Sequence, residues 1–151
     1  MTMEVIGLAR VEKTVQINAS ADKVSSTIKW ERFPEWFDSF KKVEWTSKDK
    51  EKVGSTLHIV SEVAGMKAEY DAEIVEFTPQ TLRWRTTGGN FTAISTGTIT
   101  PTKTGTEFAI AIDYELPYSV LGKLIDKLRV HKAMEMDLEK GLKGIKMAAE
   151  K

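Results

Sequence analysis

The sequence has no cysteine, no net charge and no long apolar run. Without cysteine the chain has no disulfide, no thiolate nucleophile and no cysteine-ligated metal site. The 22 basic and 22 acidic residues cancel, so no overall field attracts nucleic acid or an anionic membrane. No segment is long and apolar enough for a signal peptide or for stable insertion into a membrane. We therefore expect a cytoplasmic protein without a nucleic-acid partner.

Histidine is also scarce, with only His58 and His131 in the chain. A transition-metal site would need both, together with carboxylates, yet strand alternation places His58 on a solvated face. We therefore expect neither a metal site nor a cofactor. The common catalytic signatures are missing as well: there is no Gly-x-Ser-x-Gly elbow, no P-loop and no Gly-x-Gly-x-x-Gly. The sequence gives no prediction of the oligomeric state.

What the chain does contain is a series of apolar patterns with a period of two, which is typical of strands. The first runs from about Val5 to Asn18, and six more follow between Lys41 and Tyr114. The breaks between them are short and rich in turn-forming residues, so the strands are expected to form an antiparallel meander. The six segments read KKVEWTSK, STLHIVSEV, MKAEYDAEIVEF, TLRWRTT, FTAISTGTIT and TEFAIAIDYEL.

Other segments follow the helical period. Asn18 or Ser20 is expected to cap a short helix, which Pro34 ends or follows with another turn at Glu35. A helix of about 30 residues is expected to begin at Pro117 or Ser119, with Gly141 and Gly144 weakening its last turns. Its outer face should be solvated, with lysines alternating with Asp126, Asp137 and Glu139. Its apolar stripe is Leu121, Leu124, Leu128, Met134, Leu138, Leu142, Ile145 and Ala149.

This order predicts a single α+β domain over residues 1–151. A seven-stranded antiparallel sheet curves around the long C-terminal helix, with two short helices between the first and second strands. The space between a curved sheet and a straight helix is either filled by large side chains or left as a pocket. Small residues in mid-strand fit both a cavity and ordinary large-to-small packing. They are expected opposite the last strand, where Ile99, Gly97, Ser95, Ala93 and Phe91 pair with the series Phe108, Ile110, Ile112 and Tyr114.

Two stretches resemble the START-related helix-grip superfamily (SRPBCC), which includes polyketide cyclases/dehydrases, lipid-transfer domains and pollen-allergen-type carriers. They are ADKVSSTIKWERFPEWFDSFKKVE near the start and GTEFAIAIDYELPYSVLGKLIDKL near the end. With the element order, the resemblance covers nearly the whole chain. It implies a hydrophobic tunnel between sheet and C-terminal helix, its mouth rimmed by the short helices and hairpin loops. Because the superfamily holds both enzymes and binding proteins, the fold does not decide the function.

The leading hypothesis is that the protein binds or carries a hydrophobic small molecule, such as a lipid, an isoprenoid quinone or a polyketide-like ring. Trp36 is expected to plug the end of the sheet, while Phe37 and Phe40 lie at the pocket mouth. Tyr70, Tyr114 or His131 would orient the ligand through their polar atoms. The candidate ligand-binding residues are Phe37, Phe40, Ile59, Tyr70, Ile74, Trp84, Phe91, Phe108, Ile110, Ile112, Tyr114, Leu128, His131 and Met134.

The alternative is an enzyme of the polyketide cyclase/dehydratase type that uses the same cavity. His131 would act as its base, assisted by Glu135, which lies one helical turn later, or by Tyr70. The favoured interpretation of the same pair is a histidine at a helix edge that Glu135 or a backbone group satisfies. A protein-interaction module is a third class, although it would need an exposed apolar patch that the alternating outer faces do not suggest. Arg83 and Arg85 belong to those outer faces, where they are expected to pair with Glu69, Asp71 or Glu73.

Overall fold

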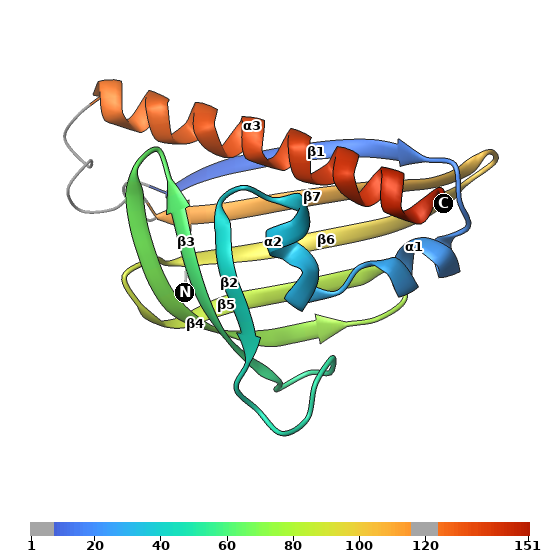
Figure 1. Ribbon diagram of the computed structural model, residues 1–151, viewed down its shortest axis with the longest axis horizontal. Helices are drawn as coiled ribbons and strands as arrows, with labels where there is room; N and C mark the ends of the chain where they lie inside the picture. Colours follow the sequence, from blue (N-terminus) through green and yellow to red (C-terminus); the bar gives the residue numbers. More distant parts are fainter. Residues whose placement is uncertain (1–7, 116–123) are drawn as a thin grey trace.

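The computed structural model describes residues 8–115 and 124–151. Within these residues, seven antiparallel strands form one sheet in the order β1-β7-β6-β5-β4-β3-β2 (Figure 1). The strands after β1 follow one another as a meander, and β1 closes the far edge beside β7. The strands are β1 (Leu8–Ile17), β2 (Phe40–Trp45), β3 (Thr56–Val63), β4 (Met66–Phe77), β5 (Thr81–Gly89), β6 (Ala93–Thr102) and β7 (Gly105–Glu115).

Short helices connect β1 to β2, and one long helix lies along the sheet. They are α1 (Ala21–Thr27), the 3-10 turn η1 (Trp30–Arg32), α2 (Phe33–Trp36) and α3 (Leu124–Ala149). Ser20 caps α1, since its side chain accepts a hydrogen bond from the Lys23 backbone N–H at 3.2 Å. The expected helix starts at Pro117 and Ser119 lie outside the described residues. Figure 1 shows α1 and α2 gathered near the C-terminal half of α3. The predicted helix-grip architecture is confirmed.

The register between β6 and β7 is the expected one. Ile99 pairs with Phe108, Gly97 with Ile110 and Ala93 with Tyr114. A Cβ atom on Gly97 would lie 3.3 Å from Cε1 of Phe108, so this small residue makes room for a core ring. The small residue at this position therefore serves packing and opens no space for a ligand.

The buried face of α3 differs from the expected stripe at two residues. Leu128 is 62% exposed, while Val130 is 5% exposed and faces the sheet. A step of three residues falls about 60° short of a full turn, so the two steps from Leu128 to Met134 leave Leu128 about 120° off the buried face. Asp137, expected in solvent, is half-buried and accepts hydrogen bonds from Ser39. It lies at the flank of the stripe, one residue before Leu138.

Gly141 and Gly144 are close-packing positions in α3. A Cβ atom on Gly141 would overlap the ring of Phe37, and one on Gly144 would lie 3.0 Å from Cδ1 of Trp36. Phe37 is 1% exposed and Trp36 is 7% exposed, so both rings are wedged between α2 and α3. The two glycines let the helix approach these aromatic rings, which fix its C-terminal half against α2.

The outer face of the sheet carries ion pairs. Arg85 pairs with Glu73 at 3.1 Å, as expected, but Arg83 pairs with Glu76 at 2.8 Å. The register of β4 and β5 shifts between Ile74 and Glu76, and this shift places Glu76 opposite Arg83. His58 lies on this solvated face, as its strand pattern predicts, between Asp71 and Glu69.

Candidate ligand-binding site

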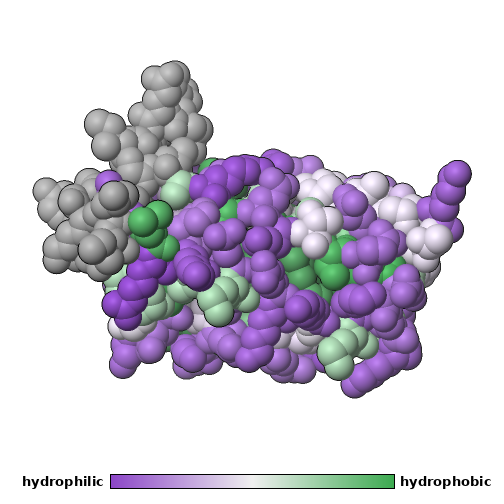
Figure 2. Space-filling view, turned by 90° about the horizontal axis from the view of Figure 1, so that it is seen from above, coloured by the Kyte–Doolittle hydropathy of each residue, from purple (hydrophilic) through white to green (hydrophobic). Residues whose placement is uncertain are grey.

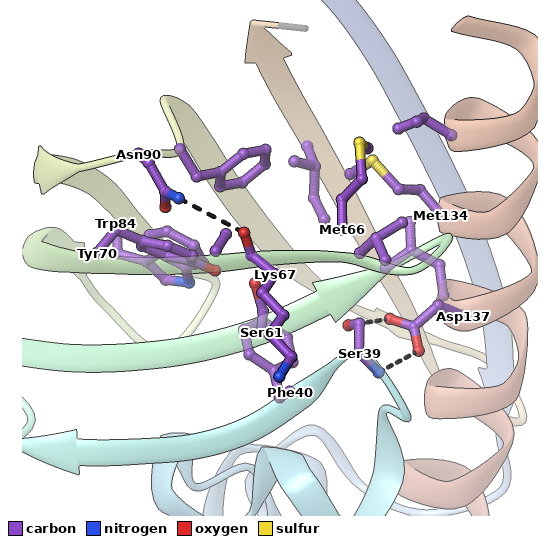
Figure 3. Close-up of a pocket in the computed structure, with 16 residues that line it drawn as sticks. Ser39, Phe40, Ser61, Met66, Lys67, Tyr70, Trp84, Asn90, Met134 and Asp137 are labelled. Atoms are coloured by element: carbon purple, nitrogen blue, oxygen red, sulfur yellow. Dashed lines mark hydrogen bonds between the residues drawn. The ribbon is translucent and has the colours of Figure 1, made fainter. Parts of the chain in front are cut away.

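A cavity of about 440 Å³ opens between the sheet and the stretch of α3 from Val130 to Leu138. Ten of its sixteen lining residues are apolar, and the polar remainder comes from several elements (Figure 3). This size and composition are typical of a pocket for an apolar small molecule. The lining residues are Ser39, Phe40, Ser61, Val63, Met66, Lys67, Ala68, Tyr70, Trp84, Asn90, Phe91, Ile112, Val130, Met134, Asp137 and Leu138.

The β3–β4 hairpin forms one wall of the cavity, and its residue sizes explain why the space is open. In the deeper part of the hairpin, Leu57 pairs with Ala72, and both are fully buried in the core. Toward the turn, Ser61 pairs with Ala68, so two small side chains face α3. No large side chain stands at this position of the hairpin to fill the gap between sheet and helix.

Aromatic rings form a second wall. The rings of Tyr70 and Trp84 are stacked with centroids 6.2 Å apart, and Phe91 lies 5.2 Å from Tyr70. Phe91 in turn stacks against Tyr114 at 6.4 Å. Tyr70 and Trp84 are buried at 3% and 4% exposure, so contact with neighbouring side chains holds these rings in place. The wall offers a rigid apolar surface to a ligand.

The polar atoms of this wall belong to Tyr70 and its neighbour Ser61. Burial raises the pKa of Tyr70 to about 12, while a hydrogen bond with Ser61 opposes the shift. The phenol is therefore neutral at ordinary pH. It brings one hydroxyl group to an otherwise apolar surface.

A carboxylate lies on the opposite wall, where α3 meets the start of β2. Asp137 accepts a hydrogen bond from the Ser39 backbone N–H at 2.9 Å and another from the Ser39 hydroxyl at 2.5 Å (Figure 3). Burial raises the pKa of Asp137 above its ordinary value, and the hydrogen bonds from Ser39 oppose the shift. Both residues also line a solvent-exposed groove of about 560 Å³, so this pair lies between the cavity and the groove.

The predicted site residues fall into three groups. Phe40, Tyr70, Trp84, Phe91, Ile112 and Met134 line the cavity. Leu128 lies on the surface and His131 at the edge of α3, and neither is among the lining residues. The others are buried in the core or in the packed end of the molecule and are not among the lining residues: Phe37, Ile59, Ile74, Phe108, Ile110 and Tyr114.

The candidate acid and base lie beside the cavity. Nδ1 of His131 is 3.4 Å from the Tyr114 hydroxyl, and its Nε2 is 3.7 Å from a carboxylate oxygen of Glu135. Glu135 also contacts Nζ of Lys13 on β1 at 3.3 Å. Tyr70 lines the cavity in a separate group with Ser61, so the structure brings two of the three candidate catalytic residues together.

Sequence reasoning missed several lining residues, and some of them had a signal. Ser61 and Val63 continue the inward alternation of Leu57 and Ile59. Val130 lies four residues before Met134, which is the helical spacing of a shared face. Asp137 and Ser39 had no comparable signal, because their contact joins segments 98 residues apart in the chain.

Two further features bear on partners. Among residues 8–115 and 124–151, no three His, Asp or Glu side chains gather in a way that would hold a metal ion. Within the same ranges, no helix combines the length and apolarity needed to cross a membrane. Figure 2 shows a mostly hydrophilic face on which apolar side chains form small, separate groups.

Solved structures resemble this chain over nearly its whole length. TTHA0849 from Thermus thermophilus is 23% identical, with a TM-score of 0.76, covering 94% of this chain and 96% of its own. The Zhui aromatase/cyclase from Streptomyces sp. R1128 is 18% identical, with a TM-score of 0.66 and coverage of 94% and 91%. A START superfamily protein from Mycobacterium smegmatis is 20% identical, with a TM-score of 0.62 and coverage of 88% and 97%. At these identities the likeness shows the fold.

Sequence comparison gives the family. No curated protein sequence matches the chain. A family model described as polyketide cyclase / dehydrase and lipid transport matches residues 9–150. The match spans both stretches that resemble the helix-grip superfamily, together with the sheet and the helix that enclose the cavity. The chain therefore belongs to the polyketide cyclase/dehydrase and lipid transport family.

Proposed function

We propose that the protein binds a hydrophobic small molecule in the cavity between the sheet and α3 and carries or sequesters it. The observation that carries the proposal is an apolar cavity of about 440 Å³ with few polar groups. Transfer of apolar surface out of water would supply the affinity, at about 25 cal/mol per Å² buried. The hydroxyl of Tyr70 and the polar atoms near Asp137 would orient the ligand.

Two experiments test this function. Native mass spectrometry of the purified protein should show a copurifying apolar molecule that organic extraction removes. A fluorescent apolar probe should bind the extracted protein with one site per chain and be displaced by lipids or isoprenoids. Absence of both copurified mass and saturable probe binding would rule out a carrier of hydrophobic molecules.

An enzymatic function is the second candidate, supported by the family and by the fold shared with an aromatase/cyclase. His131 would act as the base, assisted by Glu135 or by Tyr70 in the cavity wall. The His131 ring contacts Tyr114, whose ring stacks on the lining residue Phe91. Tyr114 would therefore have to relay a proton between the cavity and His131.

A turnover assay separates the two candidates. Incubation with a linear aromatic-polyketide precursor should yield cyclised product only if the protein is a cyclase. His131→Ala should then abolish turnover while leaving ligand affinity intact. A carrier would bind the same compounds without converting them, and His131→Ala would change nothing measurable in their fate.

A further inference from the structure

Asp137 places a hydrogen-bond-accepting carboxylate at one side of a mostly apolar cavity. It is the single carboxylate among the described lining residues, and its oxygens face Ser39 at the junction of α3 and β2 (Figure 3). On the cavity side the wall around it is apolar, with Met134 and Leu138 on the same helix, while its other side borders the solvent-exposed groove. An ionised group in such surroundings is only partly solvated.

Asp137 forms no ion pair with any residue that the structure describes. Lys140, on the next turn of α3, pairs instead with Asp38 at 2.8 Å. Glu139 and Glu135, which follow the other flank of the helix, pair with Lys13. These neighbouring charges are thus paired with one another, and the groups that hydrogen-bond Asp137 are the Ser39 hydroxyl and the backbone N–H groups of Ser39 and, more weakly, Asp38.

These donors do not saturate the carboxylate. Each oxygen has two lone pairs, and Ser39 occupies one on each oxygen. A positively charged group or a hydroxyl that enters the cavity would therefore donate a hydrogen bond to Asp137. This bond would offset part of the cost of burying the carboxylate. Charge-assisted hydrogen bonds of this kind are about twice as strong as neutral ones.

Building on the proposed function, we propose that the cavity selects apolar molecules whose polar end donates hydrogen bonds. A protonated amine is the preferred end group and a hydroxyl the next, with Asp137 as the acceptor. A carboxylate end is disfavoured there, because it would place like charges together in a poorly solvated site.

Lys67 is the cationic residue among the described lining residues, and it is the group to which a carboxylate end group would bind. It lies on the β3–β4 hairpin, and its side chain is exposed. An exposed ammonium is well solvated and attracts a carboxylate weakly. Lys67 therefore offers a carboxylate end group little compensation for the repulsion from Asp137.

A series of ligands with one chain and three end groups tests the proposal on the native protein. Decylamine, 1-decanol and decanoate bury the same alkyl chain, so differences in their affinities report the end group. Isothermal titration calorimetry at pH 7 should give decylamine the tightest binding and decanoate the weakest. The expected ratio between these two is about tenfold or more.

Variants assign the preference to its residue. Asp137→Asn keeps the shape of the side chain and should weaken decylamine binding about tenfold, with 1-decanol changed far less. Glu139→Gln removes the same charge from the outer side of α3, at a residue outside the cavity lining, and should leave the preference for the amine in place.

The outcomes separate the two proposals. If none of the three ligands binds, the proposed function fails and the preference fails with it. If all three bind native protein equally, or decanoate binds best, the cavity function stands and the selectivity for donor groups is overturned. A preference for the amine that survives Asp137→Asn would overturn the assignment to Asp137.

Discussion

The two halves of α3 meet the rest of the molecule in different ways. In the C-terminal half, Gly141 and Gly144 let the helix rest directly on the rings of Phe37 and Trp36. In the first half, Val130 and Met134 face a cavity. One end of the grip is therefore solid and the other open, although the same amphipathic helix runs through both.

The comparison shows that a small residue is not by itself a sign of a cavity. The space beside Gly141 and Gly97 is filled by aromatic rings from other elements, Phe37 and Phe108. Ser61 and Ala68 lie opposite each other near the hairpin turn and line open space. What decides between packing and a pocket is whether a large side chain from elsewhere in the fold occupies the space.

The largest effect is expected from emptying the solid end. Phe37→Ala removes a ring that is 1% exposed and should lower the free energy of unfolding by about 3–5 kcal/mol. Phe91→Ala, at the half-buried wall of the open end, should cost clearly less, because its ring already borders empty space. Urea unfolding followed by circular dichroism measures both. Equal losses would mean that the two ends are packed alike.

Overfilling the solid end comes next. Gly141→Ala would ordinarily stabilise a helix by about 1 kcal/mol. Here the added methyl group overlaps the Phe37 ring, so we expect a net loss of about 1–3 kcal/mol. Gly144→Ala is the matched change, with its nearest contact at 3.0 Å from Trp36, and should cost less. A stabilised Gly141→Ala variant would contradict the close contact with Phe37.

Filling the open end should change binding more than stability. Ala68→Leu inserts a larger side chain into the cavity and should weaken 1-decanol binding about tenfold, with little change in the free energy of unfolding. Ala72→Leu, further along the same face of β4 at a fully buried position, should instead destabilise the fold by about 1–3 kcal/mol. Calorimetry and urea unfolding on the pair measure both quantities. A strongly destabilised Ala68→Leu variant would show that the cavity is not open at this point.

The smallest effect lies on the outer face, away from both ends. His58 contacts Asp71 and Glu69 at 2.8 Å each, and these hydrogen bonds raise its pKa above 6.5. A raised pKa in the folded state means that the stabilisation is fully present below the unfolded pKa and is lost as pH rises through the folded pKa. Because the site is largely solvated, the effect should stay below about 1 kcal/mol.

The matching measurement for His58 is a comparison of two pH values. The gap in urea midpoint between the native chain and His58→Gln should be present at about pH 5.5 and shrink by about pH 8.5, on either side of the ordinary histidine pKa. A gap that grows with pH would reverse the sign of the linkage.

The fold was predictable because it depends on local periodicity. Alternating segments such as Phe108 to Tyr114 predicted their strand, its inward face and its pairing register. Tyr70, Trp84 and Ile112 followed from the same alternation and lie in the cavity lining. To predict these residues it was enough to know toward which face of the sheet each side chain points.

The rest of the site depends on contacts between distant segments. Leu128 was wrongly assigned to the buried face of α3. Two three-residue steps back from Met134 lead to Leu128 and rotate away from that face, whereas one four-residue step back leads to the buried Val130. Gly141 gave no sequence signal of its role, since its partner Phe37 lies more than a hundred positions away. Asp137 looked like a surface charge until Ser39 was brought beside it.

Methyl NMR during a titration with 1-decanol tests the difference between the two ends most directly. The proposed site predicts saturable shifts for Ile112, Val130 and Met134, which line the cavity. It predicts little change for Ile17 and Ile145, which are fully buried away from the lining. The absence of saturable shifts, or shifts centred on Ile17 and Ile145, would contradict an open ligand-binding end.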